Sequence, residues 1–411
     1  MHNLTKHDKQ TYENLFVMKS ATDCMHFEMG YSHFNADIGF LFQNYNMGDL
    51  DIAAQFKIQG KPIRIESFGS GHINDTYRVH TDSKMGPGYV LQKINHGIFK
   101  DIPLLMHNIV SVSNHLSQKY AAMGLNPEQH VLQVVPSVQG GYYYQSQEAY
   151  WRMYLYIPET RSYDRLSNPQ QAREGGRAFG QFQAMLADLD PHTLGEVLPY
   201  FCHIGYRLNN FHAALQSDTL GRKKGVETEI TFLEQRAMAM RRILEMGAVG
   251  DLPLRITHND TKFNNVLLDL QDRAQCVVDL DTVMPGYVAY DFGDAIRTII
   301  NQGTEDATDL HTIRLNIPAF KAYTEGYLEH AHTFLTAQEV DSLMEGVLLF
   351  PYMQALRFMT DYLLGDTYYK VKHPQHNLQR TRAQIRLLEE IEAHQQELQA
   401  IITSLTKPYG F

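Results

Sequence analysis

The sequence predicts an α+β fold of two lobes, with a small lobe of antiparallel strands at about 47–158 and a larger, mainly helical lobe at about 159–411. In the first region, short runs alternate apolar with polar side chains, as half-buried strands do. From Asn168 onward, apolar residues recur with the 3.6-residue period of helices. Hydrophobic residues make up 44% of the chain, which is enough for a folded core.

Residues 1–46 differ from the rest, because their short apolar patches follow no sustained period. We predict that they form an appendage outside the two lobes, with Met47 as a plausible natural start of the protein. An additional strand or a lid over the small lobe is the alternative.

The elements expected beyond Met47 are separated by turn signals. Ile63 and Ile65 alternate with polar residues in the first strand, and Tyr77 and Val79 do so in the second. A Gly-Pro-Gly turn precedes the third strand. The predicted strands are 63–66, 77–80, 89–95, 131–135 and 150–157, and the predicted helices are 103–116, 168–186, 233–244, 348–364 and 376–404.

The stretch Ile256–Asp281 carries the most specific chemistry in the chain. It contains the carboxylate of Asp260, the carboxamide of Asn265 and a second carboxylate, Asp279, at the end of an apolar strand. Phosphoryl transfer from a nucleotide uses such a set, in which one carboxylate orients a hydroxyl and accepts its proton while an amide and a carboxylate hold Mg²⁺ on the phosphates. Lys262 could neutralise charge that develops on the transferred group. For a single aspartate, a turn or N-cap role would be the ordinary explanation.

Three motifs in this part of the chain, HNDTKFNNVLLD, VVDLDTVMPG and YDFGDAIR, resemble those of the aminoglycoside phosphotransferase and choline kinase superfamily, which has the protein kinase-like fold. Within it, they look most like the N-acetylhexosamine 1-kinases, which phosphorylate the anomeric hydroxyl of N-acetylglucosamine and N-acetylgalactosamine. The family usually has glycine between the histidine and aspartate of the first motif, where this chain has Asn259. The resemblance covers nearly all of the chain after Met47 and implies ATP and Mg²⁺ as co-substrate and cofactor.

The resemblance also implies a nucleotide site in the small lobe. A glycine loop would cover the phosphates, because glycines let backbone amides approach phosphate oxygens; an ordinary hairpin turn is the alternative. A lysine of the third strand would contact the phosphates, and the backbone of the hinge would meet adenine. The residues assigned to ATP are Gly69, Ser70, Gly71, Lys93, Tyr156 and Ile157.

Kinases of this fold pair the strand lysine with a glutamate of the following helix, and the predicted helix 103–116 has none. We expect His107 or Asn108 to take the place of the glutamate, or Lys93 to be held in another way.

The tripeptide Asp291-Phe292-Gly293 spells the metal-binding motif of protein kinases, but Asp279 has the more usual separation from Asp260. We therefore assign magnesium to Asp279 and Asn265. The resemblance implies that Asp291 is structural and braces the catalytic loop. Asp281 is a second candidate near the metal, or a cap at the end of a strand.

The segment LRFMTDYLLGDTYY resembles the part of the sugar kinases that lines the acceptor pocket. It makes Arg357 and Tyr368 candidates for contact with the acceptor. An ion pair between Arg357 and Asp361, its i+4 neighbour, is the alternative. His72 could reach an acceptor hydroxyl, or could be a histidine of an exposed turn.

Composition limits the partners and the compartment. A formal net charge of −10 and a pI near 6.0 argue against a nucleic-acid partner. Three cysteines without metal-site spacing predict a reducing compartment, so we expect a cytoplasmic protein. The sequence has no apolar run long enough for a transmembrane helix and no recognisable secretion signal.

The motif residues therefore predict an ATP- and Mg²⁺-dependent kinase with Asp260 as the catalytic base, and the resemblance implies that it phosphorylates the C1 hydroxyl of an N-acetylhexosamine. Its expected partners are ATP and an amino sugar, without nucleic acid or membrane. One alternative keeps the chemistry and changes the acceptor to choline, homoserine, an aminoglycoside or another sugar. The other is a nucleotide-binding pseudokinase that scaffolds a partner.

Overall fold

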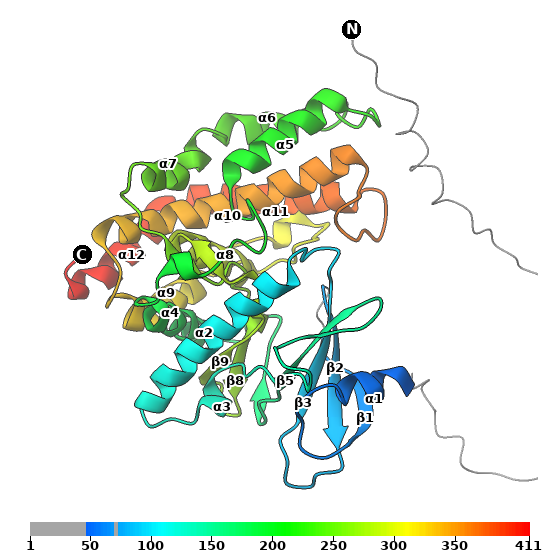
Figure 1. Ribbon diagram of the computed structural model, residues 1–411. Coiled ribbons are helices and arrows are strands. Elements are labelled where there is room, and N and C mark those ends of the chain that lie inside the picture. Colours follow the sequence, from blue (N-terminus) through cyan, green and yellow to red (C-terminus); the bar gives the residue numbers. More distant parts are fainter. Residues whose placement is uncertain (1–46, 70–72) are drawn as a thin grey trace, which may run out of the picture. The chain divides into compact units, whose positions relative to one another are not determined.

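A computed structural model describes residues 47–69 and 73–411. The predictions about residues 1–46, Ser70, Gly71 and His72 lie outside the described residues. Figure 1 shows that the strands near the N-terminal end of the described chain lie away from helices α5, α6 and α7, with α2 beside the sheet. The two-lobed α+β fold that the sequence predicts is confirmed, with an antiparallel sheet before a larger helical part.

The small lobe is built on a five-stranded antiparallel sheet in the order β1-β2-β3-β5-β4. One face is apolar, where Val79, Leu91 and Met153 pack on Ala53 and Phe56 at the end of the first helix. Its elements are α1 (Met47–Ala53), β1 (Pro62–Ser67), β2 (Asp75–Thr81), β3 (Tyr89–Ile94), β4 (Tyr144–Gln145) and β5 (Tyr150–Leu155).

The strand predicted at 131–135 does not form, and this part of the prediction is wrong. The segment follows the short helix α3 (Pro127–His130) and meets β5 through one isolated bridge, Val134 to Tyr154. The Val135 N–H still donates to the Met153 carbonyl at 2.8 Å. Pro136 comes next and cannot donate to a ladder, which keeps the pairing short.

Helix α2 (Ile102–Ala122) connects the sheet to the catalytic half of the molecule. It begins at Asp101, whose side chain accepts from the Leu104 N–H. Its buried face, including Ile109 and Val112, packs in one cluster with Tyr154 of β5 and Leu280 of the segment after β9.

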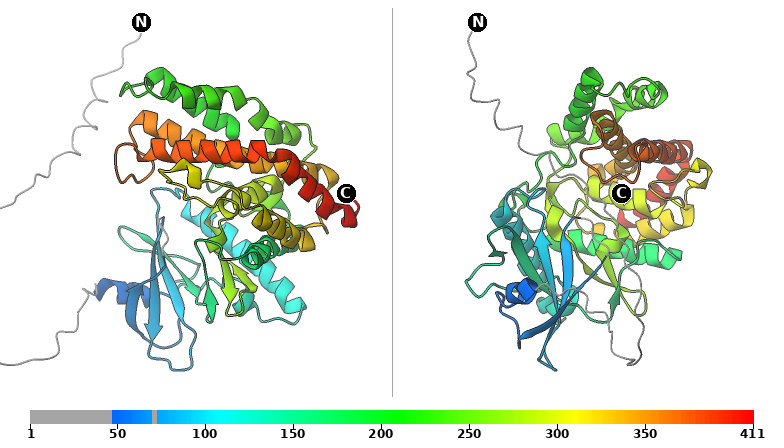
Figure 2. Two further views of the ribbon diagram at one scale, coloured as in Figure 1. Left: turned by 180° about the vertical axis from the view of Figure 1, so that it is seen from behind. Right: turned by 90° about the vertical axis from the view of Figure 1, so that its right-hand side faces the viewer.

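The large lobe consists of helices and two small sheets, β6-β8-β9 and β10-β7. Figure 2 shows α11 and α12 from behind, along α10. Among the described residues, no helix combines the length and apolar character needed to cross a membrane. The helices are α4 (Pro169–Leu186), α5 (Ile204–Ser217), α6 (Glu227–Arg236), α7 (Arg242–Ala248), α8 (Val288–Ile299), α9 (Ile317–Ala331), α10 (Ala337–Leu364), α11 (His376–Ala393) and α12 (Gln395–Thr406). The strands are β6 (Thr160–Arg161), β7 (Arg255–Thr257), β8 (Val266–Asp269), β9 (Ala274–Val277) and β10 (Met284–Gly286).

Two of the predicted helices are broken in the structure. The helix predicted at 233–244 ends at Arg236, because the Tyr352 hydroxyl donates to the Leu233 carbonyl at 2.8 Å and the chain tightens into a 3₁₀ turn. The one predicted at 376–404 breaks at His394, where α11 ends and α12 begins. Helix α10 instead starts earlier than predicted, at a capping box formed by Thr336 and Glu339.

Helices α8 and α10 touch backbone to backbone at a pair of glycines. A Cβ atom on Gly293 would lie 2.2 Å from the Gly346 carbonyl oxygen, and one on Gly346 would lie 2.0 Å from the Ala289 carbonyl oxygen. Only hydrogen side chains allow this approach. This close contact fixes α8, which carries Asp291 and Asp294, against α10.

Candidate active site

The residues from His258 to Asn265 form a loop between β7 and β8, and the turn at 280–283 runs beside it. The antiparallel pairing of β7 with β10 places these two segments together. Thr282 Oγ1 donates to the His258 carbonyl at 2.7 Å, and Asn259 Nδ2 donates to the Thr282 carbonyl at 3.0 Å.

Asn259, which stands where the resembled family has glycine, has a left-handed backbone with φ 63°. Glycine adopts this conformation freely, and asparagine is among the few other residues that tolerate it. The asparagine side chain is buried and hydrogen-bonded, so the replacement keeps the loop geometry.

Asp291 of α8 fixes the backbone of this loop through hydrogen bonds. Its carboxylate accepts the backbone N–H groups of His258 at 2.8 Å and Asn259 at 2.7 Å, and Gln183 Nε2 at 2.7 Å. One turn further along α8, Asp294 accepts the Thr261 N–H at 3.0 Å. Burial raises the pKa of Asp291, although the bound donors oppose the shift. These are the contacts that a bracing aspartate would make.

Three of the predicted catalytic and metal residues contact one another. Lys262 Nζ lies 2.9 Å from Asp260 Oδ1, and Asn265 Nδ2 donates to the Asp260 carbonyl oxygen at 2.8 Å. Burial raises the pKa of Asp260, but the Lys262 ammonium outweighs it, and the net shift is downward. Asp260 is therefore ionised at neutral pH, as an acceptor of a hydroxyl proton must be.

Asp279 joins this cluster from the end of β9. The Val278 N–H donates to the Asn265 carbonyl at 2.9 Å, which brings the two predicted metal ligands together. Asp279 has φ 61°, a conformation that is uncommon outside glycine and is often found at functional sites. Desolvation, then the charges of Asp281 and Asp260, raise the pKa of Asp279 to about 7.

The donor set suits a hard divalent cation. Because Asn265 directs its amide nitrogen at Asp260, its side-chain oxygen is left to accept, and the crowded carboxylate of Asp279 lacks a close counter-charge. Within the described residues, no group of three His, Cys, Asp or Glu side chains forms a complete metal site alone. Mg²⁺ in nucleotide sites is held by one or two carboxylates together with phosphate oxygens, and this arrangement matches that pattern.

The structure does not bring Lys93 to these carboxylates. Its ammonium lies 6.0 Å from the centre of the Trp151 ring, on the sheet face that packs against α1. Burial raises the pKa of Asp49 in α1, and the charge of Lys93 opposes that shift. Since successive residues of a strand point to opposite faces, the neighbouring Arg152 faces the other way.

Arg152 is the cation that contacts Asp281, two residues after the predicted metal ligand Asp279, and the sequence reasoning missed it. It is 1% exposed, and its Nη1 lies 2.5 Å from Asp281 Oδ1. Its other nitrogens donate to Gln92 Oε1 at 2.8 and 2.9 Å. Asn74 Nδ2 donates to the second oxygen of Asp281 at 2.7 Å. The sequence offered one signal for such a partner: Asp281 follows an apolar strand, and a carboxylate that is buried there needs a cation or donors beside it.

Neither His107 nor Asn108, the two residues suggested as substitutes for the helix glutamate, pairs with Lys93, which leaves the alternative that Lys93 is held in another way. His107 contacts the Thr193 carbonyl at 2.9 Å. Asn108 donates to the carbonyls of Gly195 at 2.8 Å and Val283 at 2.9 Å. Asn108 thus ties α2 to the segment that follows Asp281.

The remaining nucleotide candidates are partly described. Gly69 has φ 78° and is exposed, as a turn glycine would be. The Tyr156 N–H is already used by the Gly88 carbonyl, and the Arg78 guanidinium lies 3.2 Å from the centre of the Tyr156 ring. Ile157 is buried, and its carbonyl accepts from Thr160 Oγ1 at 2.9 Å.

The acceptor candidates lie together, and the alternative ion pair does not form. Arg357 donates to Gln354 at 2.8 Å, and its Cζ lies 6.0 Å from the centre of the Tyr368 ring. Asp361 instead accepts the backbone N–H groups of residues 367–369 and Asn377 Nδ2. Tyr368 is 65% exposed.

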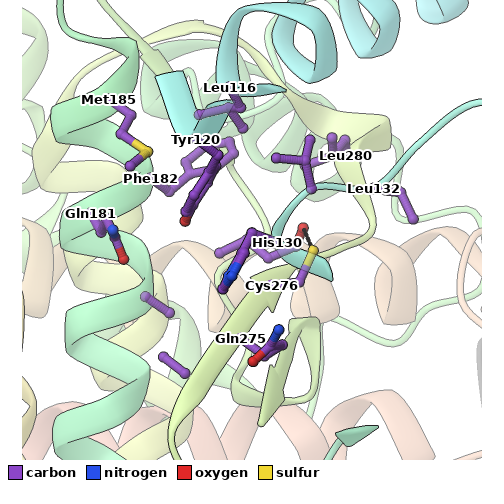
Figure 3. Close-up of a pocket in the computed structure, with 14 residues that line it drawn as sticks. Leu116, Tyr120, His130, Leu132, Gln181, Phe182, Met185, Gln275, Cys276 and Leu280 are labelled. Atoms are coloured by element: carbon purple, nitrogen blue, oxygen red, sulfur yellow. Dashed lines mark hydrogen bonds between the residues drawn. The ribbon is translucent and has the colours of Figure 1, made fainter. Parts of the chain in front are cut away.

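A pocket between α2, α4 and β9 is separate from these residues. Figure 3 shows Tyr120, His130 and Cys276 around it. Its volume is about 20 Å³, which is room for about one water molecule. None of the predicted catalytic, metal or acceptor residues lines it.

Comparison with known proteins agrees with this geometry. The APH phosphotransferase enzyme family matches residues 64–329. Similar solved structures include an aminoglycoside phosphotransferase from Alicyclobacillus acidocaldarius (12% identity, TM-score 0.51, covering 91% of this chain and 98% of that one). They also include an amicoumacin kinase in complex with AMP-PNP and Ca²⁺ (16%, 0.54, 83% and 93%) and a microcompartment-associated aminopropanol kinase (13%, 0.54, 85% and 98%).

At such identities the solved structures establish the fold alone, whereas the family match spans more than half of the chain and includes the whole catalytic loop. The chain belongs to the phosphotransferase enzyme family APH.

Proposed function

We propose that this protein is an ATP- and Mg²⁺-dependent kinase that transfers a phosphoryl group to the anomeric hydroxyl of an N-acetylhexosamine. The observation that carries the phosphoryl-transfer part is the contact of Asp260 with Lys262 and Asn265 in a loop braced by Asp291. An ionised carboxylate beside an amide and a second carboxylate is the set that phosphoryl transfer requires.

In the proposed reaction, Asp260 accepts a hydrogen bond from the acceptor hydroxyl and aligns its oxygen with the γ-phosphorus of ATP. The oxygen–phosphorus bond forms as the bond to the leaving ADP breaks, and the hydroxyl proton passes to Asp260. Lys262, within contact of the base, stabilises the charge on the transferred group. A Mg²⁺ ion held by Asn265 and Asp279 would neutralise the phosphates.

Positioning does most of the work in this chemistry. The two oxygens of Asp291 fix the backbone on the N-terminal side of Asp260, and Asp294 fixes Thr261 on the other side. The base is thus held by hydrogen bonds on both sides before any substrate binds.

The assignment of ATP contacts rests on the family and on the small-lobe geometry. Gly69 remains a proposed part of a phosphate-covering loop, and Tyr156 and Ile157 remain proposed neighbours of adenine. Lys93 remains a sequence-based proposal as well, but its position beside Trp151 favours Arg152 as the strand cation near the metal.

A sugar acceptor is favoured over a cationic one by the charge around Arg357. Its guanidinium lies near the rings of Phe201, Tyr368 and Tyr369, at 5.6 to 6.0 Å from their centres. The positive charge of Arg357 repels choline, ethanolamine or an aminoglycoside, and its guanidinium can donate to sugar hydroxyl or acetamido oxygens. The C1 position follows from the motif resemblance.

The test is ADP release with ATP, Mg²⁺ and a panel of acceptors: N-acetylglucosamine, N-acetylgalactosamine, glucose, choline, homoserine and kanamycin. We expect turnover with N-acetylhexosamines, and ³¹P NMR of the product should show an anomeric phosphate. Turnover restricted to choline, homoserine or kanamycin, or a phosphate on another sugar oxygen, would contradict the proposal. Nucleotide binding without turnover on any acceptor would favour a pseudokinase.

A further inference from the structure

Two arginines, Arg207 of α5 and Arg357 of α10, both contact Phe201: Arg207 donates to the Phe201 carbonyl at 2.8 Å, and Arg357 Cζ lies 5.6 Å from the centre of the Phe201 ring. Burial lowers the pKa of Arg207, and the charge of Arg357 lowers it further. Figure 1 shows α5 and α10 side by side. Both side chains are only partly exposed, so water screens the repulsion incompletely.

No carboxylate compensates this pair. Among the residues that the structure describes, neither guanidinium has a nitrogen within 4.0 Å of a carboxylate oxygen. Arg207 donates to the Phe201 carbonyl at 2.8 Å and Arg357 to the Gln354 side chain at 2.8 Å. Both acceptors are neutral, so the pair keeps two positive charges in a protein whose net charge is −10.

The acidic residues of the surrounding segments already have partners. Asp294 and Glu305 bind Arg297, Asp366 binds Arg222, and Asp361 accepts backbone N–H groups. In contrast, two polar atoms at this pair are buried without a hydrogen-bond partner in the described structure: Nε of Arg207, and Oη of Tyr369, whose ring centre lies 5.6 Å from Arg357 Cζ. Buried polar atoms normally have partners, which points to an additional ligand.

The arginine pair lies next to the catalytic loop. Cys202 Sγ is 3.8 Å from Asn259 Oδ1, and Asn259 directly precedes Asp260. Phe201, which contacts both guanidinium groups, directly precedes Cys202, so neighbouring residues connect the arginine pair to the loop that carries Asp260.

We propose that the acceptor is an anionic sugar, whose carboxylate or phosphate group is bound by the guanidinium groups of Arg207 and Arg357. Arginine binds both groups through charge-assisted, often bidentate hydrogen bonds. The proposal rests on the sugar kinase function above and narrows its acceptors to those with a negative charge away from C1. The transfer itself is unchanged: the C1 oxygen gains the phosphoryl group, ADP leaves, and the proton goes to Asp260.

The test compares kcat/KM for three acceptors that share one ring: N-acetylglucosamine, its 6-phosphate and the corresponding C6 carboxylate. The wild-type protein should favour at least one anionic form by about 10- to 100-fold, the size expected for a hydrogen bond to a charged group. Comparison of kcat/KM for the 6-phosphate and for the C6 carboxylate shows which anionic group the site prefers.

Arg207→Met should lower kcat/KM for the anionic acceptor much more than for N-acetylglucosamine, so that most of the preference is lost. A merely structural role would lower both activities in proportion and leave their ratio unchanged. Arg386→Met, which removes a guanidinium paired with Glu389 on α11, is the matched control and should keep the ratio. Should Arg207→Met fail to fold, Arg207→Gln takes its place, and calorimetric titration of the wild-type protein should show tighter binding of the 6-phosphate than of N-acetylglucosamine.

Equal or higher kcat/KM for the neutral sugar in the wild type would overturn the anionic-acceptor proposal while leaving the sugar kinase function standing. A preference that survives Arg207→Met would overturn it too. If none of the three sugars is phosphorylated but another acceptor is, the sugar kinase function itself fails, and the two results are distinguishable.

Discussion

At Asp260, the neighbouring side chains determine the chemistry. Lys262 keeps the carboxylate ionised and Asn265 orients it. We expect Asp260→Asn to reduce kcat by about 10²- to 10⁴-fold, the range for loss of a general base, while AMP-PNP binding measured by calorimetry persists. Asp341→Asn, a change of an exposed carboxylate on α10, should leave kcat unchanged. Turnover near the wild-type rate in Asp260→Asn would show that Asp260 is not the general base.

Lys93 and Arg152 offer a second test at this scale. Removing one partner of a buried ion pair costs about 3–5 kcal/mol, so Arg152→Met should be strongly destabilised in urea unfolding and should need more Mg²⁺ for activity. Lys93→Met should change stability by less than about 1 kcal/mol, because the partly buried Lys93 forms no ion pair among the described residues, and it should have little effect on KM for ATP.

A large rise in KM for ATP in Lys93→Met would contradict this prediction and would indicate that Lys93 contacts the phosphates of ATP. The double variant Arg152→Met/Asp281→Asn, which leaves no unpaired charge, should recover part of the lost stability.

Short-range chemistry could be predicted from the sequence, and long-range pairing could not. Asp260, Asn265 and Asp279 lie within one short stretch, so their convergence needs only a loop and a hairpin. Asn74 and Arg152 reach Asp281 from the small lobe, and the Asn74 contact spans 207 residues. No local pattern marks such partners, because they are set by how the sheet lies on the catalytic segment.

At the scale of elements, α8 is the support of the catalytic loop, and its contact with α10 depends on glycine. Gly293→Ala would place a Cβ atom 2.2 Å from the Gly346 carbonyl oxygen, so the helices must separate. We expect a loss of about 1–3 kcal/mol, as in overpacked cores, seen as a lower urea midpoint. Because Asp291 shares this helix, kcat should fall as well.

Gly48→Ala is the control for this change. Nothing lies within 4 Å of a Cβ atom at Gly48, and alanine favours helices, so α1 should be unaffected or slightly more stable. An unchanged midpoint in Gly293→Ala would show that the two helices are not held at this distance.

Elements with a strong period were predicted well, and their ends were not. Strands β1, β2, β3 and β5 and helix α4 lie where the alternation of apolar residues and the helical period placed them. The helix expected at 233–244 was lost because a tyrosine of α10 satisfies the Leu233 carbonyl. The strand expected at 131–135 shortened beside Pro136. Tertiary contacts of this kind override local preference.

At the scale of the whole molecule, Asp306 connects the segment after α8 with the start of α11. It lies near Lys372 Nζ, at 3.2 Å, and His376 Nε2, at 3.3 Å. Burial raises the pKa of Asp306, but these donors outweigh burial and lower it to about 2. Since the folded pKa is below the unfolded value, the stabilisation is present above about pH 4 and is lost as the pH falls toward 2.

Asp306→Asn should therefore lower the free energy of unfolding at pH 6 by no more than about 1 kcal/mol, because a third of the side chain is exposed and solvent screens the pair. The difference from the wild type should shrink between pH 4 and pH 2.5 in denaturant titrations. A difference that is constant with pH would show that the carboxylate charge does not contribute.

The proposed base and the proposed acceptor contacts come from separate stretches of the chain. Asp260 sits in a loop fixed by α8, whereas Arg207 and Arg357 come from α5 and α10. Substitutions near those two arginines can therefore redirect specificity without disturbing catalysis, both during divergence of related enzymes and in the laboratory. Mutant libraries confined to these positions are a practical starting point for retargeting this scaffold to new carbohydrates.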